Sequence, residues 1–277
     1  MLDWFGVALG RDTAAAVLAR RMLFVLPFIL VIILVEVKIN RPWTYWHVAG
    51  IEDGPIEWLT AIIYMVAALW AGKLAWRFHR TGLAVHAVLS AILALGMFVI
   101  GMEEISWGQR VFGIASPEFF VTANRQQELN LHNLGHNKAF LDAAYLVVTF
   151  YAMTARLWVP RLLAAFQNGR FASLGRLVSP PAFLLPYFLV PFLLYLYYVN
   201  VPFLKEAFGE HWGYGYIPEQ GYFMISRDQE PAECILALGF LFFSMWLLAQ
   251  QYFGAWSSAK NSLPSAESLT QHRYYKG

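Results

Sequence analysis

The sequence predicts an all-α, polytopic membrane protein with about six transmembrane helices and both termini in the cytoplasm. Of its 277 residues, 58% are hydrophobic and 14% are charged, whereas a soluble domain is roughly 45 to 50% apolar and about 25% charged. The apolar residues fall in six runs, each long enough to cross about 30 Å of hydrocarbon as a helix. An aromatic content of 17% adds rings that favour the headgroup region.

The six predicted spans belong to a single transmembrane domain, residues 1–256. They lie at 22–39, 56–76, 83–102, 140–158, 182–200 and 232–253. The first span follows Arg20 and Arg21 and lacks a small-residue cleavage site after it, so we expect a retained anchor. Residues 103–139 are too polar for hydrocarbon and are expected to form a partly helical outer loop. The polar residues 257–277 are expected to form a flexible cytoplasmic tail.

The distribution of basic residues predicts the orientation. With six spans, 13 of the 20 Lys and Arg residues fall on the side of the termini, and the positive-inside rule makes that side cytoplasmic. Only three of the 18 acidic residues share that side, namely Asp3, Asp12 and Glu267. The sequence therefore predicts a multi-pass protein of the bacterial inner membrane whose carboxylates gather at the outer face.

The same features exclude several kinds of partner. The basic residues are dispersed, which argues against nucleic acid. No phosphate-binding loop or dinucleotide fingerprint is present, so no nucleotide is expected. The single cysteine, Cys234, allows neither an internal disulfide nor a cysteine metal site. The expected partners are membrane lipids and other membrane protein subunits.

Glu103 and Glu104 are the first candidate site residues, because they end the third predicted span. A helix presents its negative dipole end there, so two carboxylates need compensation. Arg110, about two turns further on, is one candidate, and a metal ion or a buried proton are the others. A solvated loop start with a surface ion pair is the alternative.

A second candidate site follows in the same loop. Ser116 and Pro117 are typical of a helix start, and we expect that helix to run through Asn124 to His136. Glu128, His132 and His136 would then share one stripe at four-residue spacing. Together with Glu104 they would suit a divalent zinc, iron or manganese ion. Histidines that face solvent or bond to each other are the alternative.

Other acids lie near the outer ends of spans. Glu57 and Glu233 are predicted in the first turns of spans two and six, where capping explains a carboxylate. Both share the membrane depth of Glu103 and Glu104, so converging helices could join four carboxylates in one site. Glu36 lies inside span one, where an acid is costly. His211 belongs to an aromatic, glycine-containing loop that either covers a bound lipid or forms an interfacial belt.

The segment EEISWGQRVFGIASPEFF, followed by NRQQELNLHNL and preceded by EDGPIEWLT, resembles the signature of a family of uncharacterised bacterial polytopic membrane proteins. That resemblance covers about residues 50–140 and implies no activity. A looser analogy links His132 and His136 to the HxxxH pair of membrane hydrolases similar to alkaline ceramidases and adiponectin receptors, which hold zinc. Those proteins have seven helices, and no matching Ser and Asp is found here.

Three functions are compatible with these features. The first is a metal-dependent membrane hydrolase or transferase that acts on a lipid or lipid-linked substrate, with Glu103 or Glu57 as general base. The second is a structural or assembly subunit of a larger membrane complex. The third is ion or proton translocation through Glu36 and the outer carboxylates.

Overall fold

Six long apolar helices form the core of the protein and confirm the predicted all-α class with six possible membrane spans. The computed structural model describes residues 13–51, 54–124, 127–131, 133–134, 138–165, 172–208 and 228–252. Within these ranges the ordered elements are helical, apart from one isolated bridge, and six helices are long and apolar enough to cross a membrane. The chain is therefore a multi-pass helical membrane protein.

Each predicted span coincides with one of these helices. The spanning helices are α1 (Ala14–Asn40), α3 (Pro55–Arg80), α4 (Ala84–Glu104), α7 (Lys138–Ala165), α9 (Leu185–Phe208) and α10 (Gln229–Tyr252). The short elements are α2 (Pro42–Tyr45), η2 (Trp46–Gly50), η3 (Ser106–Gly108), α5 (Gln109–Phe112), α6 (Glu118–Ala123), α8 (Ala172–Val178) and η4 (Ala182–Leu184). The predicted tail, residues 257–277, lies outside the described residues.

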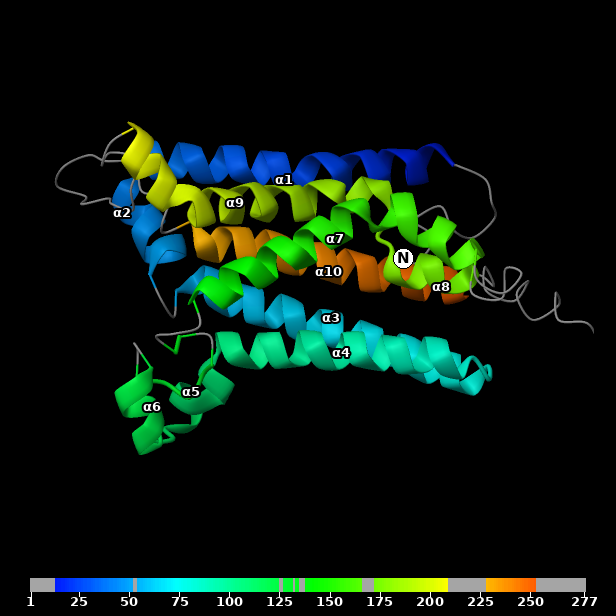
Figure 1. Ribbon diagram of the computed structural model, residues 1–277, viewed down its shortest axis with the longest axis horizontal. Helices are drawn as coiled ribbons and strands as arrows, with labels where there is room; N and C mark the ends of the chain where they lie inside the picture. The colour runs from blue at the N-terminus through cyan, green and yellow to red at the C-terminus, as the bar shows by residue number, and fades with distance from the viewer. Residues whose placement is uncertain are drawn as a thin grey trace, which may run out of the picture.

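The spanning helices run along the long axis of the bundle, so their ends define two faces (Figure 1). One end of the bundle, which we call the acidic end, holds the C-terminal ends of α1, α4 and α9 and the N-terminal ends of α3, α7 and α10. At the opposite end, the basic end, α1 begins and α10 finishes. All described carboxylates lie at or near the acidic end, in the last turns of helices, the first turns, or the loops between them. The charge separation predicted from the sequence is thus a property of the described bundle.

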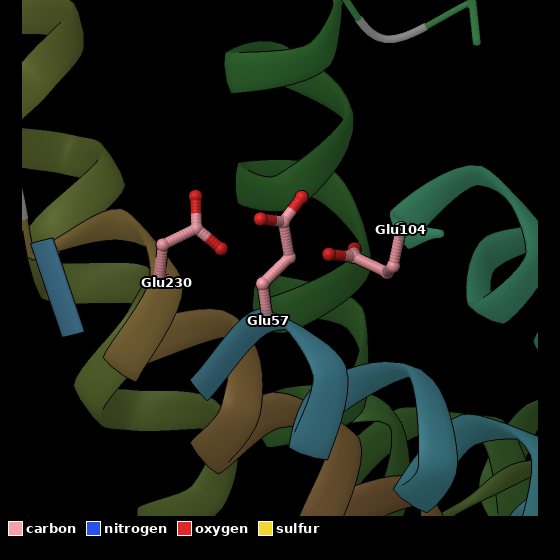
Figure 2. Close-up of side chains that lie close together, drawn as sticks. All are labelled: Glu57, Glu104 and Glu230. Atoms are coloured by element: carbon pink, nitrogen blue, oxygen red, sulfur yellow. The ribbon is translucent and has the colours of Figure 1, made fainter. Parts of the chain in front are cut away.

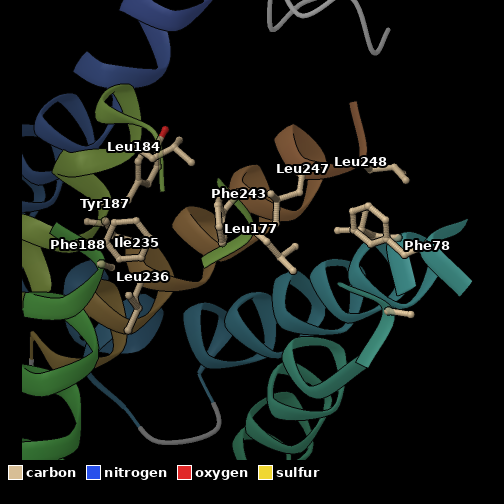
Figure 3. Close-up of a cluster of buried hydrophobic side chains, with 13 residues drawn as sticks. Phe78, Leu177, Leu184, Tyr187, Phe188, Ile235, Leu236, Phe243, Leu247 and Leu248 are labelled. Atoms are coloured by element: carbon tan, nitrogen blue, oxygen red, sulfur yellow. The ribbon is translucent and has the colours of Figure 1, made fainter. Parts of the chain in front are cut away.

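The helix α10 is the central element of the core. In its most apolar window 61% of the residues are buried, against 11% for α1. Phe243 and Leu247 on α10 pack in one cluster with Tyr187 and Phe188 of α9 and with Phe78 of α3 (Figure 3). A helix with apolar residues all round is expected in such a central position, whereas the exposed apolar side chains of α1 suit contact with lipid.

Small residues let the central helices approach closely. A Cβ atom on Gly239 of α10 would lie 2.8 Å from the Cβ of Tyr187 on α9. On α4, a Cβ at Gly101 would lie 3.2 Å from the backbone oxygen of Ala61 on α3. Close contact between small residues is the usual means of helix association in membranes. It fixes the ends of α3, α4 and α10 relative to one another, and these ends carry the candidate site.

The loop between α4 and α7 is only partly helical, and one predicted helix in it is wrong. The elements η3, α5 and α6 extend sideways from the end of α4 (Figure 1). The helix that we predicted to run through Asn124 to His136 ends at Ala123. Asn124 instead forms an isolated antiparallel bridge with Leu134. Residues 127–131 are not helical, so Glu128 does not lie on the predicted helix, whereas His132 and His136 lie outside the described residues.

Candidate functional site

Three carboxylates from three helices meet at the acidic end. Glu57, Glu104 and Glu230 each offer an oxygen that lies within 4.8 Å of the oxygens of the other two. Figure 2 shows Glu57 between Glu104 and Glu230, with the three side chains directed toward a common space. Glu57 and Glu104 are buried and Glu230 is half-buried. We call these three residues the acid site.

The local structure of each helix explains where its carboxylate lies. Glu57 follows Pro55, the first residue of α3, and Glu230 is the second residue of α10. Both therefore lie in first turns, where free backbone N–H groups and the helix dipole favour negative charge. Glu104 is the last residue of α4, where the dipole opposes it. The acid site thus combines two favoured carboxylates with one that needs compensation from outside its own helix.

More acidic and phenolic groups surround Glu104. The carboxylates of Glu233, Glu230, Glu57 and Glu103 are all close enough to act on it electrostatically. Glu233 accepts a hydrogen bond from the hydroxyl of Tyr195, whose ring stacks on Tyr145 at a centroid distance of 4.2 Å. Among the described residues, no basic side chain forms an ion pair with Glu104. A cation or protons must balance the negative charge at this position.

Glu103 has a different environment from its neighbour. Its carboxylate accepts hydrogen bonds from the indole Nε1 of Trp107 at 2.7 Å and from the backbone N of Leu131 at 2.6 Å. These contacts hold a tight turn, in which Ser106 and Trp107 have φ values of 48° and 56°. Such backbone angles are unfavourable for residues other than glycine and persist only where surrounding contacts impose them. Glu103 is therefore a structural support of the loop beside the acid site.

Glu128 lies in this loop network rather than in the acid site. It is buried, accepts a hydrogen bond from the hydroxyl of Ser106 and forms an ion pair with Arg110. Asn130 donates to Glu128 at 3.2 Å and to Ser106 at 2.8 Å. Arg110, one of the candidates to compensate Glu103 and Glu104, forms an ion pair with Glu128. Among the described residues, Glu128 is not part of the carboxylate group that contains Glu104, so its predicted role as a metal ligand stays a prediction.

Replacing Glu128 with Gln is expected to loosen the loop and to leave the helix bundle folded. The change removes the charge partner of Arg110 within a hydrogen-bond network. Because Arg110 is half-exposed, we expect a loss of about 1 to 3 kcal/mol rather than the larger cost of a fully buried pair. Limited proteolysis of the loop in mild detergent measures the change. The matched control is Glu118→Gln, since Glu118 is exposed in the same loop; equal cleavage of both variants would contradict the prediction.

The remaining predicted site residues are placed as follows. Glu36 is exposed and accepts a hydrogen bond from Asn40, one turn later in α1, at 3.2 Å. It is thus an end-of-helix residue and not part of the acid site. His132, His136 and His211 lie outside the described residues, so their proposed roles stay predictions.

Glu233 was predicted from the sequence, in the first turn of the sixth span, whereas Glu230 was not. The reason is the helix boundary: we expected span six to begin after Pro231, whereas α10 begins at Gln229. Proline is well tolerated in the first turn of a helix, because its missing N–H has no intrahelical acceptor there. The signal that could have found Glu230 is its position directly before Pro231.

Comparisons with protein-family models, with curated proteins and with solved structures found no match. The resemblance of the 103–134 segment to a family of bacterial membrane proteins therefore remains an expectation from its motif.

Proposed function

We propose that the protein is a multi-pass enzyme of the bacterial inner membrane, a metal-dependent hydrolase or transferase that acts on a lipid or lipid-linked substrate. The observation that carries the proposal is the meeting of Glu57, Glu104 and Glu230, from three helices, within 4.8 Å. Ionised carboxylates this close repel one another strongly where water is scarce. A divalent cation held by the three removes the repulsion and explains why helix packing brings them together.

The donor set narrows the choice of ion. Our sequence-based candidates were zinc, iron and manganese, but that choice relied on two histidines. The acid site offers carboxylate oxygens from Glu57, Glu104 and Glu230, and sites built from oxygen favour manganese over zinc. A divalent ion here would act as a Lewis acid on a carbonyl or phosphoryl oxygen and would lower the pKa of water.

The surrounding residues have separate roles in this proposal. Glu57, Glu104 and Glu230 hold the ion. Glu233, adjacent to them and hydrogen-bonded to Tyr195, is the candidate for proton transfer, in place of Glu57. Glu103, which we first considered as general base, orients the turn after α4 through Trp107 and Leu131.

A lipid substrate is supported by the apolar surface next to the acid site. The segment that follows Glu104 exposes large side chains, with Trp107 37%, Phe112 75% and Phe119 63% exposed. This segment continues directly from a membrane-spanning helix and lies beside the bundle end (Figure 1). Aromatic side chains at such a position favour the interface between headgroups and hydrocarbon. A substrate anchored in the same leaflet would reach the carboxylates by lateral movement.

The position of the acids also separates this proposal from ion translocation. A proton or ion path needs polar groups at successive depths, whereas the described carboxylates gather at one end of the bundle. By the positive-inside rule, that end faces away from the cytoplasm. The second function, a subunit of a larger complex, has no specific contact in its favour among the described residues.

Metal analysis of the purified protein tests the proposal. We expect stoichiometric manganese, or iron or zinc in its place, in the wild type and its loss in Glu104→Gln and Glu57→Gln. Glu118→Gln removes an exposed carboxylate outside the acid site and is expected to retain the metal. A wild-type protein without bound metal after growth and dialysis with manganese would overturn the proposal. Release of a water-soluble product from a bacterial lipid extract, dependent on Glu233, tests the enzymatic part.

A further inference from the structure

A groove at the basic end, far along the bundle from the acid site, has the chemistry of a binding site. It has a volume of about 690 Å³ and lies between α1, α7, α8 and α10. Every charged residue that lines it is an arginine: Arg20, Arg21, Arg156 and Arg176. We propose that this groove binds the phosphate headgroup of an anionic phospholipid.

The four arginines of the groove come from three helices. Arg20 and Arg21 come from the start of α1, Arg156 from α7 and Arg176 from α8. Four positive charges that line one groove attract an anion electrostatically. Guanidinium groups bind phosphate oxygens in pairs of parallel hydrogen bonds, so four of them suit a phosphodiester better than a single carboxylate.

A buried hydroxyl gives an independent indication of a ligand. Ser179 also lines the groove, and the residue is only 7% exposed. Its Oγ is buried and has no hydrogen-bond partner among the described residues. Buried hydroxyl groups are nearly always hydrogen-bonded in native proteins. The next two residues, Pro180 and Pro181, have no backbone N–H and cannot donate a hydrogen bond. The hydroxyl of Ser179 can therefore serve as the hydrogen-bond donor to a phosphate oxygen in this part of the groove.

The remaining walls fit the apolar part of a lipid. The groove is also lined by Phe24 of α1, Phe183 of η4 and Trp246 of α10. The adjoining surface of α1 is exposed along its length and faces hydrocarbon in a membrane. A phospholipid could therefore place its headgroup among the arginines and its acyl chains along α1 without leaving the bilayer. Basic pockets between spanning helices are known to hold anionic headgroups in this way.

Native mass spectrometry of the protein in mild detergent tests the proposal with three ligands. Phosphatidylglycerol is expected to bind in stoichiometric amount, and phosphatidylcholine, which has the same phosphate without net charge, at least tenfold more weakly. Inorganic phosphate is expected not to compete at millimolar concentration. If inorganic phosphate displaces the lipid, or if both lipids bind equally, the assignment to an anionic phospholipid is wrong.

Matched variants locate the site. Arg21→Gln/Arg156→Gln removes two exposed arginines of the groove and is expected to weaken phosphatidylglycerol binding roughly tenfold or more. Lys73→Gln/Arg80→Gln removes two charges from α3, which does not line the groove, and is expected to leave binding unchanged. Arg21→Lys/Arg156→Lys keeps the charge and is expected to retain part of the affinity. Equal losses in the groove variant and the α3 variant would overturn the proposal.

Discussion

Removal of divalent cations is expected to lower the unfolding temperature of the wild-type protein and to leave that of Glu104→Gln unchanged. A cation that binds the folded acid site stabilises it by about 2.7 kcal/mol when its concentration is 100-fold above the Kd. Without the cation, Glu57, Glu104 and Glu230 remain within 4.8 Å of one another, and their repulsion opposes folding. In Glu104→Gln the metal no longer binds, and the repulsion among the three carboxylates is smaller because one of them is uncharged.

The difference in unfolding temperature between the wild type and Glu104→Gln should therefore have opposite signs in manganese and in chelator. In manganese the wild type is expected to be the more stable protein, and in chelator Glu104→Gln is expected to be the more stable one. Thermal unfolding in mild detergent, followed by circular dichroism, measures both conditions. Glu118→Gln, outside the acid site, should follow the wild type in each. A chelator effect of the same size in Glu104→Gln would show that any stabilising cation binds elsewhere.

The fold was predictable because the membrane imposes simple rules on sequence. A helix must satisfy its own backbone hydrogen bonds in hydrocarbon, so a long apolar run specifies a spanning helix with little help from tertiary contacts. Because the apolar runs also define where each helix begins and ends, the sequence places Glu57 at the start of α3 and Glu104 at the end of α4. Their approach to within 4.8 Å depends in addition on close packing at residues such as Gly101, which a single sequence does not reveal.

The loop after α4 was predicted less well because its structure depends on side-chain hydrogen bonds. The helix start at Ser116 and Pro117 was nearly correct, since α6 begins at Glu118. Its predicted continuation failed because Asn124 bonds to Asn130, both to the backbone oxygen at 2.9 Å and to the side chain at 2.7 Å. Asparagine side chains compete in this way with the helical backbone. Glu128, one of the three residues that suggested a metal site, is thus explained by its contacts with Ser106 and Arg110 in this loop.

Loss of the negative charge at Asp228 is expected to have the largest effect on stability of any change near the acid site. Lys38 of α1 donates to both carboxylate oxygens of Asp228, at 2.7 and 2.8 Å, and Tyr45 donates a further hydrogen bond. The Lys38 side chain is only 8% exposed. Asp228→Asn removes the carboxylate charge that faces this buried ammonium group, and breaking a buried ion pair typically costs about 3 to 5 kcal/mol. Because Asp228 is 23% exposed, we expect about 3 kcal/mol.

The double variant Lys38→Met/Asp228→Asn separates this charge effect from a general loss of packing. It removes both charges, and the side chain of Asn keeps an acceptor for Tyr45, so most of the lost stability should return. Thermal unfolding of the wild type, both single variants and the double variant in mild detergent gives the coupling energy. If the two single effects simply add, the ion pair does not stabilise the junction of α1 and α10.

The same ion pair is expected to affect the acid site, although neither residue belongs to it. Asp228 directly precedes α10, and its backbone oxygen accepts a hydrogen bond from the N of Ala232. Glu230 lies between these two residues, so the position of its carboxylate depends on this first turn. Asp228→Asn should therefore weaken manganese binding, and the double variant should restore it in parallel with stability. Calorimetric titration with manganese measures both; unchanged affinity in Asp228→Asn would show that Glu230 is positioned by the packing of α10 against α3 and α9 alone.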